Sequence, residues 1–517
     1  MVSVVLSNAC KSRSVVGLSM PSTSLSTLRS CLHAGLAALA LLMLCLTPAR
    51  GQEAAPSPPD PRFGIVETFV NPAAASEAGA GYTRVILRWD VIQPDSPVDW
   101  KPANVPDPLI AGELAAGREV VGLLIGTPAW AAASGQAPGS RAVPDMAAWE
   151  AFTRRMAQHY QGRIRHWVIW NEPDVWQEGH PGQTWDGTVE DYAQLLKTAY
   201  GAIKGVDPAM QVYVAGMTYY WDWEHGRRRY LDRLLEAIAA DPAAPAAGYF
   251  FDGVVYHLYF TPRQTSDVLA ETWQSLARYG MTGKQIWINE TNAPPSDDPQ
   301  EPPWSAPRFR VSLEEQAAFI LQQFSLAFAG GASRVQVYKL RNTADHPESI
   351  EPFGLLRADD SPRPAFDAFK TAATHLAGFT SARLERQGGV IAVTFERGDR
   401  TTTVLWSEAA PRTVTLRAIA PQGLLVDERG QAQTVSAAGG VYRLSLPGAT
   451  CRDAVPCRIG GAPRLLVEQG AAAGRAALTV ASAPLPALPV PAASPPASQL
   501  TQDRPWRPGR PGYLWRQ

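Results

Sequence analysis

Short apolar runs alternate with longer segments of helical periodicity between about residues 63 and 378. The runs lack the strict two-residue alternation of a half-solvated strand, which favours strands buried on both faces of a parallel sheet. The expected strands are 63–69, 82–89, 119–125, 167–170, 211–215, 251–259, 285–290 and 334–340. Because a helix-length segment separates each run from the next, the pattern predicts an α/β fold with a (β/α)8 TIM barrel over residues 63–378.

Two of the intervening helices have recognisable starts. Asp145 is a suitable N-cap for a segment with apolar residues at helical spacing, which leads into the run 167–170. Ser312 and Glu315 have the spacing of a capping box, which predicts a helix running toward Phe328.

The character of the chain changes after the barrel segment. Residues 379–469 show short Val, Thr and Leu alternations broken by turn residues, which predicts a small all-β sandwich domain. Residues 470–517 are rich in Ala and Pro, and we expect an extended or disordered tail.

The amino terminus has the features of an export signal. Within residues 1–51, Arg29 precedes the apolar run 35–46, and the small residues Ala49 and Gly51 follow at the -3 and -1 positions of an expected cleavage site. The run is too short to span a bilayer comfortably, although its retention as an anchor is an alternative. Met20 is an alternative start, and residues 52–62 form a linker. We therefore expect a secreted or extracytoplasmic protein without a membrane span in the mature chain, or a cell-surface protein if the segment is retained.

Composition narrows the possible partners. The 517 residues are 45% hydrophobic and 18% charged, which is globular composition, and a net charge of -1 argues against nucleic acid as a partner. Three of the five cysteines fall in the leader, which leaves Cys451 and Cys457. In an exported chain this pair predicts a disulfide that closes a short loop, with free thiols as the alternative. No pattern indicates an oligomeric state.

The chemistry is expected at two glutamates. Glu172 follows the fourth predicted strand and Glu290 ends the seventh, and a closed barrel brings the carboxyl ends of all its strands to one mouth. Two carboxylates there can divide the work of glycoside cleavage: one protonates the leaving oxygen while the other, ionised, attacks the anomeric carbon. A lone glutamate would more simply be a salt-bridged residue at a strand end, so the hypothesis rests on the pair.

Three motifs in order carry a resemblance to a known group of enzymes. Residues 170–173 read WNEP, residues 257–259 read HLY and residues 287–290 read WINE. With these motifs the chain resembles glycoside hydrolase clan A, the 4/7 superfamily, and most of all family 39-like and family 5-like retaining glycosidases. The resemblance covers about residues 63–378 and implies a carbohydrate substrate, β-linked, cleaved by double displacement.

The resemblance also implies roles for single residues. Glu172 would be the general acid/base and Glu290 the nucleophile, while Asn171 would donate to the sugar 2-hydroxyl. Tyr259 would hold the nucleophile or the substrate, and so would His257, which by itself would more often be a packed core histidine.

One basic residue matches the family pattern and another departs from it. Arg88 matches an arginine at the end of strand two that lies beside the nucleophile, where its charge would keep Glu290 ionised. A structural ion pair at the barrel mouth is the alternative, and the two are compatible. Lys339 stands near a position where many clan members carry tryptophan, and it would either pair with an acid or reach an acidic sugar.

Three tryptophans on predicted mouth loops are candidate sugar platforms. They are Trp130, Trp176 and Trp304, and for each of them core or loop packing is the simpler alternative. HExxH, paired CxxC, Walker and GxSxG motifs are absent from the sequence, so neither a metal nor a nucleotide cofactor is implied.

These observations predict an exported retaining glycosidase with the two carboxyl groups about 5–5.5 Å apart. Replacing Glu290 with alanine should abolish turnover and leave the fold intact. The alternatives are a catalytically silent carbohydrate-binding barrel protein at the cell surface and, with less support, a structural surface protein that attaches through the β-domain and the tail.

Overall fold

The computed structural model describes residues 58–480 apart from 177–179, 181, 303, 305–306, 308, 343–351, 453–456 and 472–477. The expected export signal lies outside the described residues, and so does most of the expected tail.

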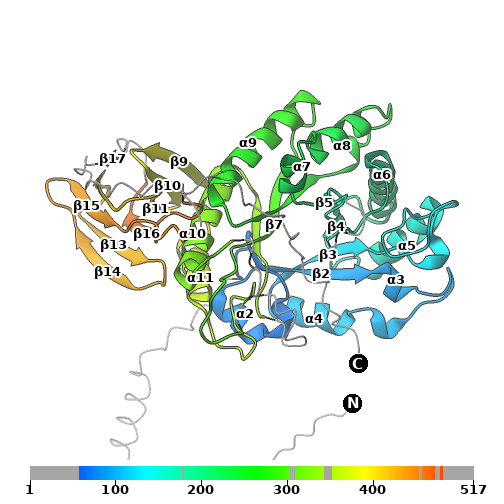
Figure 1. The fold of residues 1–517 in the computed structure, drawn as a ribbon, viewed down its shortest axis with the longest axis horizontal. Coiled ribbons are helices and arrows are strands. Elements are labelled where there is room, and N and C mark those ends of the chain that lie inside the picture. Colours follow the sequence, from blue (N-terminus) through cyan, green and yellow to red (C-terminus); the bar gives the residue numbers. More distant parts are fainter. Residues whose placement is uncertain are drawn as a thin grey trace, which may run out of the picture. The chain divides into compact units, whose positions relative to one another are not determined.

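The described residues form a closed barrel of eight parallel strands in chain order, surrounded by helices (Figure 1). The predicted (β/α)8 barrel is therefore confirmed. The strands are β1 (Phe63–Ile65), β2 (Tyr82–Arg88), β3 (Glu119–Ile125), β4 (His166–Asn171), β5 (Gln211–Met217), β6 (Gly253–Tyr259), β7 (Gln285–Asn292) and β8 (Arg334–Val337).

Each strand is followed by helical structure before the next strand begins. The α-helices are α2 (Pro72–Ala78), α3 (Trp89–Ile92), α4 (Asp107–Ala115), α5 (Met146–His159), α6 (Val189–Val206), α7 (Tyr220–Glu224), α8 (Tyr230–Ala239), α9 (Pro262–Arg278), α10 (Leu313–Ala329) and α11 (Pro364–Leu376). Short 3-10 turns lie at η1 (Thr68–Val70), η2 (Pro102–Asn104), η3 (Ala129–Ala131) and η4 (Gly248–Phe250).

Local sequence signals determine where several helices begin. Asp145 caps α5 by accepting from the backbone N–H of Ala148, as predicted. Ser312 and Glu315 form the predicted capping box at the start of α10.

The inside of the barrel is filled by side chains from alternate strand positions. Tyr82, Val121, Leu123, Val168, Tyr213, Val255 and Trp287 form one buried cluster there. Such a packed interior leaves the mouth, at the carboxyl ends of the strands, as the place where polar side chains can converge on a ligand.

The carboxyl-terminal part is all β, as predicted, and consists of antiparallel sheets with the strand orders β14-β13-β16-β11-β10-β9 and β15-β12-β17. Its strands are β9 (Ser381–Gln387), β10 (Val390–Arg397), β11 (Arg400–Ser407), β12 (Arg412–Arg417), β13 (Gln422–Asp427), β14 (Ala432–Ser436), β15 (Val441–Leu446), β16 (Arg464–Gln469) and β17 (Thr479–Val480).

One of these strands corrects the predicted start of the tail at residue 470. β17 pairs with β12, where Val414 lies opposite Val480. The neighbouring Leu478 is buried in the apolar core of this domain. Because the composition of residues 470–480 is dominated by alanine, the short apolar segment that completes the sheet is inconspicuous in the sequence.

The β-domain contacts the helical shell of the barrel through α10 and α11. Gln322 of α10 donates to the carbonyl oxygen of Gly460 and accepts from its N–H, both at 3.0 Å. Thr402 donates from its hydroxyl to the carbonyl oxygen of His375 at 2.8 Å. Through α10 and α11 the domain is joined to the outer helices of the barrel.

Over the described residues, no helix is both long enough and apolar enough to cross a membrane.

Candidate active site

Glu172 follows β4 directly and takes an unusual backbone conformation. Its φ angle is 44°, and that of Trp170 is 74°, in the left-handed region that side chains other than glycine rarely adopt. The N–H of Glu172 donates to the carbonyl oxygen of Gly216 on β5 at 2.9 Å, which holds the turn against the neighbouring strand. Strained backbone that surrounding structure maintains in this way is typical of functional sites.

Glu290 lies within β7 and is 7% exposed. Its Oε1 accepts from Nη2 of the Arg84 guanidinium, and its Oε2 accepts from the hydroxyl of Tyr259 at 2.6 Å. Tyr259 belongs to the adjacent strand β6, whereas Arg84 belongs to β2, which is not adjacent to β7 in the barrel. Glu290 is therefore held in place through both carboxylate oxygens.

His257 of β6 connects the two glutamates. Its Nδ1 lies 2.7 Å from Oε1 of Glu172 and 3.5 Å from Oε2 of Glu290. An Nδ1 lone pair facing an ionised carboxylate would be repelled, so a proton must lie between His257 and Glu172. The contact therefore fixes the orientation of the Glu172 carboxyl group toward the imidazole.

The two carboxylates are close enough to act on one bond. One oxygen of Glu172, one oxygen of Glu290 and a ring nitrogen of His257 all lie within 4.8 Å of one another. The same trio has the spacing of metal ligands. However, Arg84 already supplies a buried positive charge to Glu290, and Nδ1 of His257 is engaged with Glu172, so paired carboxylates describe the site better than a metal centre.

The electrostatics of the site favour an ionised Glu290. Burial alone would raise the pKa of this carboxyl group, but the charges of His257 and Arg84, together with hydrogen bonds from Tyr259 and Arg84, outweigh burial and lower it. For His257, burial opposes the charged form, yet attraction to Glu290 and Glu172 raises the pKa. Burial and the charge of Glu290 raise the pKa of Tyr259, so its hydroxyl remains a donor.

The prediction that Arg88 lies beside the nucleophile is wrong, because Arg84 takes that place. The side chain of Arg84 is 3% exposed and forms an ion pair with Glu290. The side chain of Arg88 is 36% exposed and pairs with Asp90 at 2.5 Å instead. Arg84 and Arg88 are an even number of residues apart on β2, so both point to the same face, but Arg84 lies deeper. A charged residue in the middle of an otherwise apolar strand was the signal that could have identified Arg84.

Gly216 is a requirement of this site that the sequence did not indicate. A Cβ at position 216 would overlap the imidazole ring of His257, including Nε2. The strand therefore approaches His257 more closely than any side chain would allow. Glycine at this point lets the imidazole reach Glu172.

Replacing Gly216 with alanine is expected to displace His257. We expect kcat on a glycoside substrate to fall by at least about 10-fold, the scale of a disturbed proton transfer, and the free energy of unfolding to fall by about 1–3 kcal/mol from overpacking. Steady-state kinetics and urea unfolding measure the two effects. Gly201→Ala in α6 is the matched control, because a Cβ there meets nothing within 4 Å. It should leave kcat unchanged, and similar kinetics for both variants would contradict the steric argument.

The structure distributes the remaining candidates around the mouth. Asn171 ends β4 with a half-buried side chain that forms no hydrogen bond to any described residue. Trp130 donates from Nε1 to the carbonyl oxygen of Gln93 at 2.9 Å, so this ring is tied to the segment that follows α3. Trp176 is 41% exposed. Trp304 packs near Phe353 at a centroid distance of 6.3 Å.

Trp176 and Lys339 have partners that limit the groups they can offer to a sugar. The guanidinium of Arg227 lies 4.2 Å from the centre of the Trp176 ring, so one face of that indole is covered. Lys339 is buried, and its Nζ lies 3.6 Å from a carboxylate oxygen of Glu67. Of the two roles expected for this lysine, the contact matches pairing with an acidic residue.

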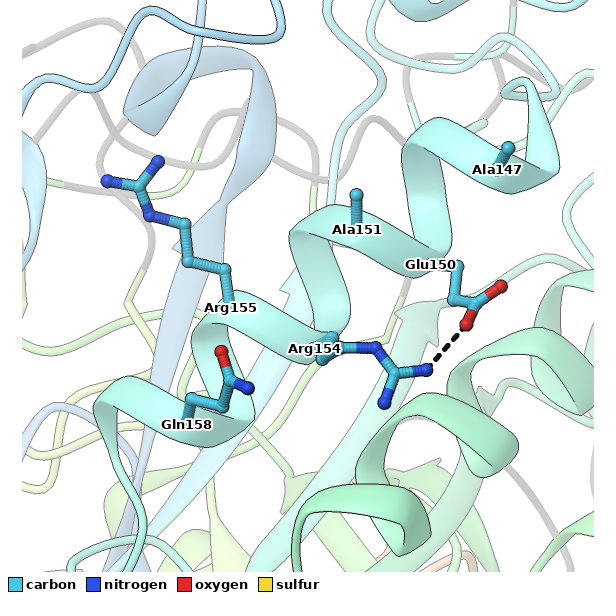
Figure 2. A pocket seen from close by; sticks show the side chains of 6 residues that line it. All are labelled: Ala147, Glu150, Ala151, Arg154, Arg155 and Gln158. Carbon is cyan, nitrogen blue, oxygen red and sulfur yellow. Dashed lines mark hydrogen bonds and ion pairs between the residues drawn. The ribbon is translucent and has the colours of Figure 1, made fainter.

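A surface hollow of about 530 Å³ lies elsewhere, on α5 (Figure 2). All of its lining residues belong to this one helix, and Glu150 pairs with Arg154 across it. They lie opposite the α5 face of Trp149, Phe152 and Met156 that is buried toward the barrel. Among the described residues, no second element brings a functional group to this hollow, so we place the candidate chemistry at the mouth.

The structure joins Cys451 and Cys457 in a disulfide with their Cα atoms 4.7 Å apart. This bond closes a short loop after β15. The loop also contacts the barrel, because Thr450 donates from its hydroxyl to Glu315 at 2.5 Å, at the start of α10.

Several solved structures share this fold. A family 39 glycoside hydrolase from the gut symbiont Bacteroides cellulosilyticus WH2 is similar at a TM-score of 0.59 and 18% identity, over 79% of this chain and 81% of that chain. A GH39 β-xylosidase from Caulobacter crescentus has a TM-score of 0.52 and 15% identity, over 80% and 97%. A GH30 endoxylanase from Clostridium papyrosolvens C71 has a TM-score of 0.53 and 12% identity, over 80% and 97%.

Sequence comparison adds no relative to these structures. No protein-family model matches the chain, and no curated protein does. At identities this low the structural likeness concerns the fold. The chain thus has the barrel architecture found in solved glycoside hydrolases of families 39 and 30.

Proposed function

We propose that this chain is a retaining glycoside hydrolase that cleaves β-linked O-glycosidic bonds of oligo- or polysaccharides. The observation that carries the proposal is the pair Glu172, after β4, and Glu290, in β7, whose carboxylate oxygens lie within 4.8 Å of each other. Inverting enzymes separate their carboxyl groups by about 6.5–9.5 Å to admit a water, and retaining ones by about 5–5.5 Å. The short separation supports the retaining route.

The environments of the two glutamates divide the roles. Glu290, paired with the buried Arg84, is the ionised group and attacks the anomeric carbon. As the carbon–oxygen bond of the leaving group breaks, Glu172 gives that oxygen a proton, and a glycosyl ester remains on Glu290. Glu172 then takes a proton from water, which attacks the same carbon and releases Glu290.

Neighbouring side chains support both steps. The hydroxyl of Tyr259 donates to Oε2 of Glu290 and aims this carboxylate at one position. His257 keeps a proton between itself and Glu172 and fixes the orientation of that carboxyl group. Asn171 extends a half-buried amide beside them that suits a sugar hydroxyl.

A panel of aryl β-glycosides tests this proposal with the wild type, Glu172→Gln and Glu290→Gln. We expect hydrolysis of at least one β-glycoside by the wild type, and proton NMR should show that the sugar is released first with retained anomeric configuration. Release of the inverted anomer would overturn the retaining mechanism.

The same panel separates catalysis from simple binding. A 2-deoxy-2-fluoro sugar with a good leaving group should form a covalent adduct on Glu290, which mass spectrometry locates after proteolysis. A chain that binds oligosaccharides without turnover or adduct would instead be a catalytically silent binding barrel.

We further propose that the protein works outside the cytoplasm. The disulfide Cys451–Cys457 supports this, because such bonds persist in oxidising compartments. Fractionation of cells that express the full chain, followed by amino-terminal sequencing of the exported form, tests both export and cleavage near residue 51.

A further inference from the structure

Asp174 lies two residues beyond Glu172 and is 1% exposed. Its Oδ2 accepts from the N–H and the hydroxyl of Thr218, at 2.8 and 2.7 Å, and from the N–H of Tyr219 at 3.2 Å. Thr218 and Tyr219 directly follow β5. A single carboxylate oxygen therefore joins the loop after β4 to the loop after β5.

The loop that Asp174 holds is the one that presents Glu172. The N–H of Val175 donates to the carbonyl oxygen of Glu172 at 3.2 Å, so Glu172 and Asp174 belong to one tight turn with Pro173 between them. The turn is attached to β5 at two points, through the N–H of Glu172 to Gly216 and through the side chain of Asp174. The side chain of Asp174 thus adds a second attachment, which restricts rotation of the turn about the first.

Both joined loops contain backbone that needs such support. The φ angle of Glu172 is 44° and that of Tyr219 is 61°. For residues with a Cβ these angles are strained, and they persist only when surrounding contacts impose them. The hydrogen bonds to Asp174 impose the angle at Tyr219 directly and act on the turn that contains Glu172.

We propose that Asp174 is a positioning residue that holds Glu172 in the orientation needed for proton donation to the leaving group. This inference rests on the proposed glycosidase function. It goes beyond that function because it assigns a role to a buried residue that forms no hydrogen bond with either Glu172 or Glu290 through its side chain. Its effect is transmitted through the backbone of the turn.

The charge state of Asp174 guides the choice of variants. Burial, the largest cause, raises the pKa of this carboxyl group to about 7, and the charges of Glu172 and Asp222 add to the rise while hydrogen bonds from Thr218 oppose it. Asparagine reproduces the protonated form and keeps an acceptor oxygen for Thr218 and Tyr219. Alanine removes the acceptor altogether.

Leaving-group dependence separates positioning from a merely structural role. Acid assistance matters for a poor leaving group such as an unsubstituted phenol and hardly at all for dinitrophenol, which departs without a proton. Asp174→Ala should therefore lower kcat/KM for phenyl glycosides by about 10- to 100-fold, a part of the roughly 10²- to 10⁴-fold that general acid catalysis contributes, and for dinitrophenyl glycosides by less than about 3-fold. Asp174→Asn should stay near the wild type on both substrates.

Thr218 offers a milder test that does not depend on the folding of the alanine variant. Thr218→Val keeps the shape and removes the hydroxyl donor, and Thr218→Ser keeps the donor. The valine variant should show the same leaving-group bias as Asp174→Ala but smaller, by about 3- to 10-fold, whereas the serine variant should show none. Asp222→Asn is the control for loss of a buried carboxylate, because Asp222 binds Arg233 rather than the Glu172 turn.

The outcomes distinguish the two proposals. If the wild type hydrolyses glycosides but Asp174→Ala and Thr218→Val slow phenyl and dinitrophenyl substrates by equal factors, Asp174 has only a structural role and the inference is overturned. If Asp222→Asn shows the same bias as Asp174→Ala, the effect is not specific to the turn and the inference also fails. A wild type inactive on every glycoside would remove the proposed function itself.

Discussion

Replacing Glu290 with glutamine is expected to lower kcat by a factor on the order of 10⁵ or more, because the covalent route is lost together with its nucleophile. Glutamine matches glutamate in shape and can still accept from Tyr259, so the substrate should bind with a similar KM. Single-turnover kinetics with a dinitrophenyl glycoside measures the loss of chemistry without interference from product release.

The same substitution is also expected to destabilise the fold, which corrects the view that a mouth residue can be removed without cost. Glu290 neutralises the buried guanidinium of Arg84, whose side chain is 3% exposed. Removing one member of a buried ion pair costs about 3–5 kcal/mol because the other charge stays buried and unpaired. Urea unfolding of Glu290→Gln, Glu290→Ala and the double variant Arg84→Met/Glu290→Leu tests this, and the double variant should recover most of the loss.

External azide provides an independent check on the role of Glu290. In Glu290→Ala, azide can enter the space left by the side chain and attack the anomeric carbon from the same face as the missing carboxylate. The product should be a glycosyl azide of inverted configuration. A glycosyl azide of retained configuration would identify position 290 as the acid/base instead and would reverse the assignment of the two glutamates.

Replacing Arg84 with methionine is expected to have the second largest effect. Methionine retains much of the buried volume but removes the charge, and loss of one preorganised electrostatic contact typically costs about 10²- to 10³-fold in kcat. Arg88→Met is the matched control. It removes an arginine from the same strand face whose charge is paired with Asp90, so kcat should stay within about 3-fold of the wild type, as for an exposed ion pair.

The pH profile gives Arg84→Met a signature that a packing defect would lack. Arg84 and His257 lower the pKa of Glu290, so in the wild type this group stays ionised as the pH falls. Without Arg84 the pKa rises, and the acidic limb of the kcat/KM profile should move to higher pH. In Arg88→Met the limb should not move. A shift in Arg88→Met with none in Arg84→Met would restore the assignment based on the family pattern.

His257 couples the two glutamates, because its ring faces both carboxylates. It lies 2.7 Å from Glu172 and 3.5 Å from Glu290, so a change at either glutamate alters its charge environment. The negative charges of Glu290 and Glu172 raise the pKa of His257. Variants at Glu172 and Glu290 are therefore expected to be non-additive, and the double variant should lose less activity than the two single losses combined.

Much of the architecture follows from the sequence alone. Eight apolar runs, each followed by a segment of helical period, predict the (β/α)8 barrel, because parallel strands buried on both faces must be apolar along their whole length. The positions of Glu172 and Glu290 at strand ends predict that they meet at one mouth. The capping box at Ser312 and Glu315 is equally local, since it involves one turn of chain.

Only the tertiary structure decided which arginine reaches Glu290. Strand alternation places Arg84 and Arg88 on the same face of β2, and their depth relative to β7 depends on the tilt and stagger of strands around the barrel. Those quantities are set by packing across the whole barrel and are not visible in the local sequence. The sequence therefore predicted an arginine on β2, but it indicated Arg88 rather than Arg84, which lies four residues earlier on the same strand face.

The same reason applies to the contacts around Glu172. His257 reaches this carboxyl group because Gly216 on β5 leaves room for its ring, and Asp174 holds the turn because Thr218 follows the same strand. Each contact joins residues more than 40 positions apart in the chain, since Asp174 and Thr218 are separated by 44 and Glu172 and His257 by 85. The sequence shows which of these residues are present, but which of them contact each other is determined only when the strands close into a barrel.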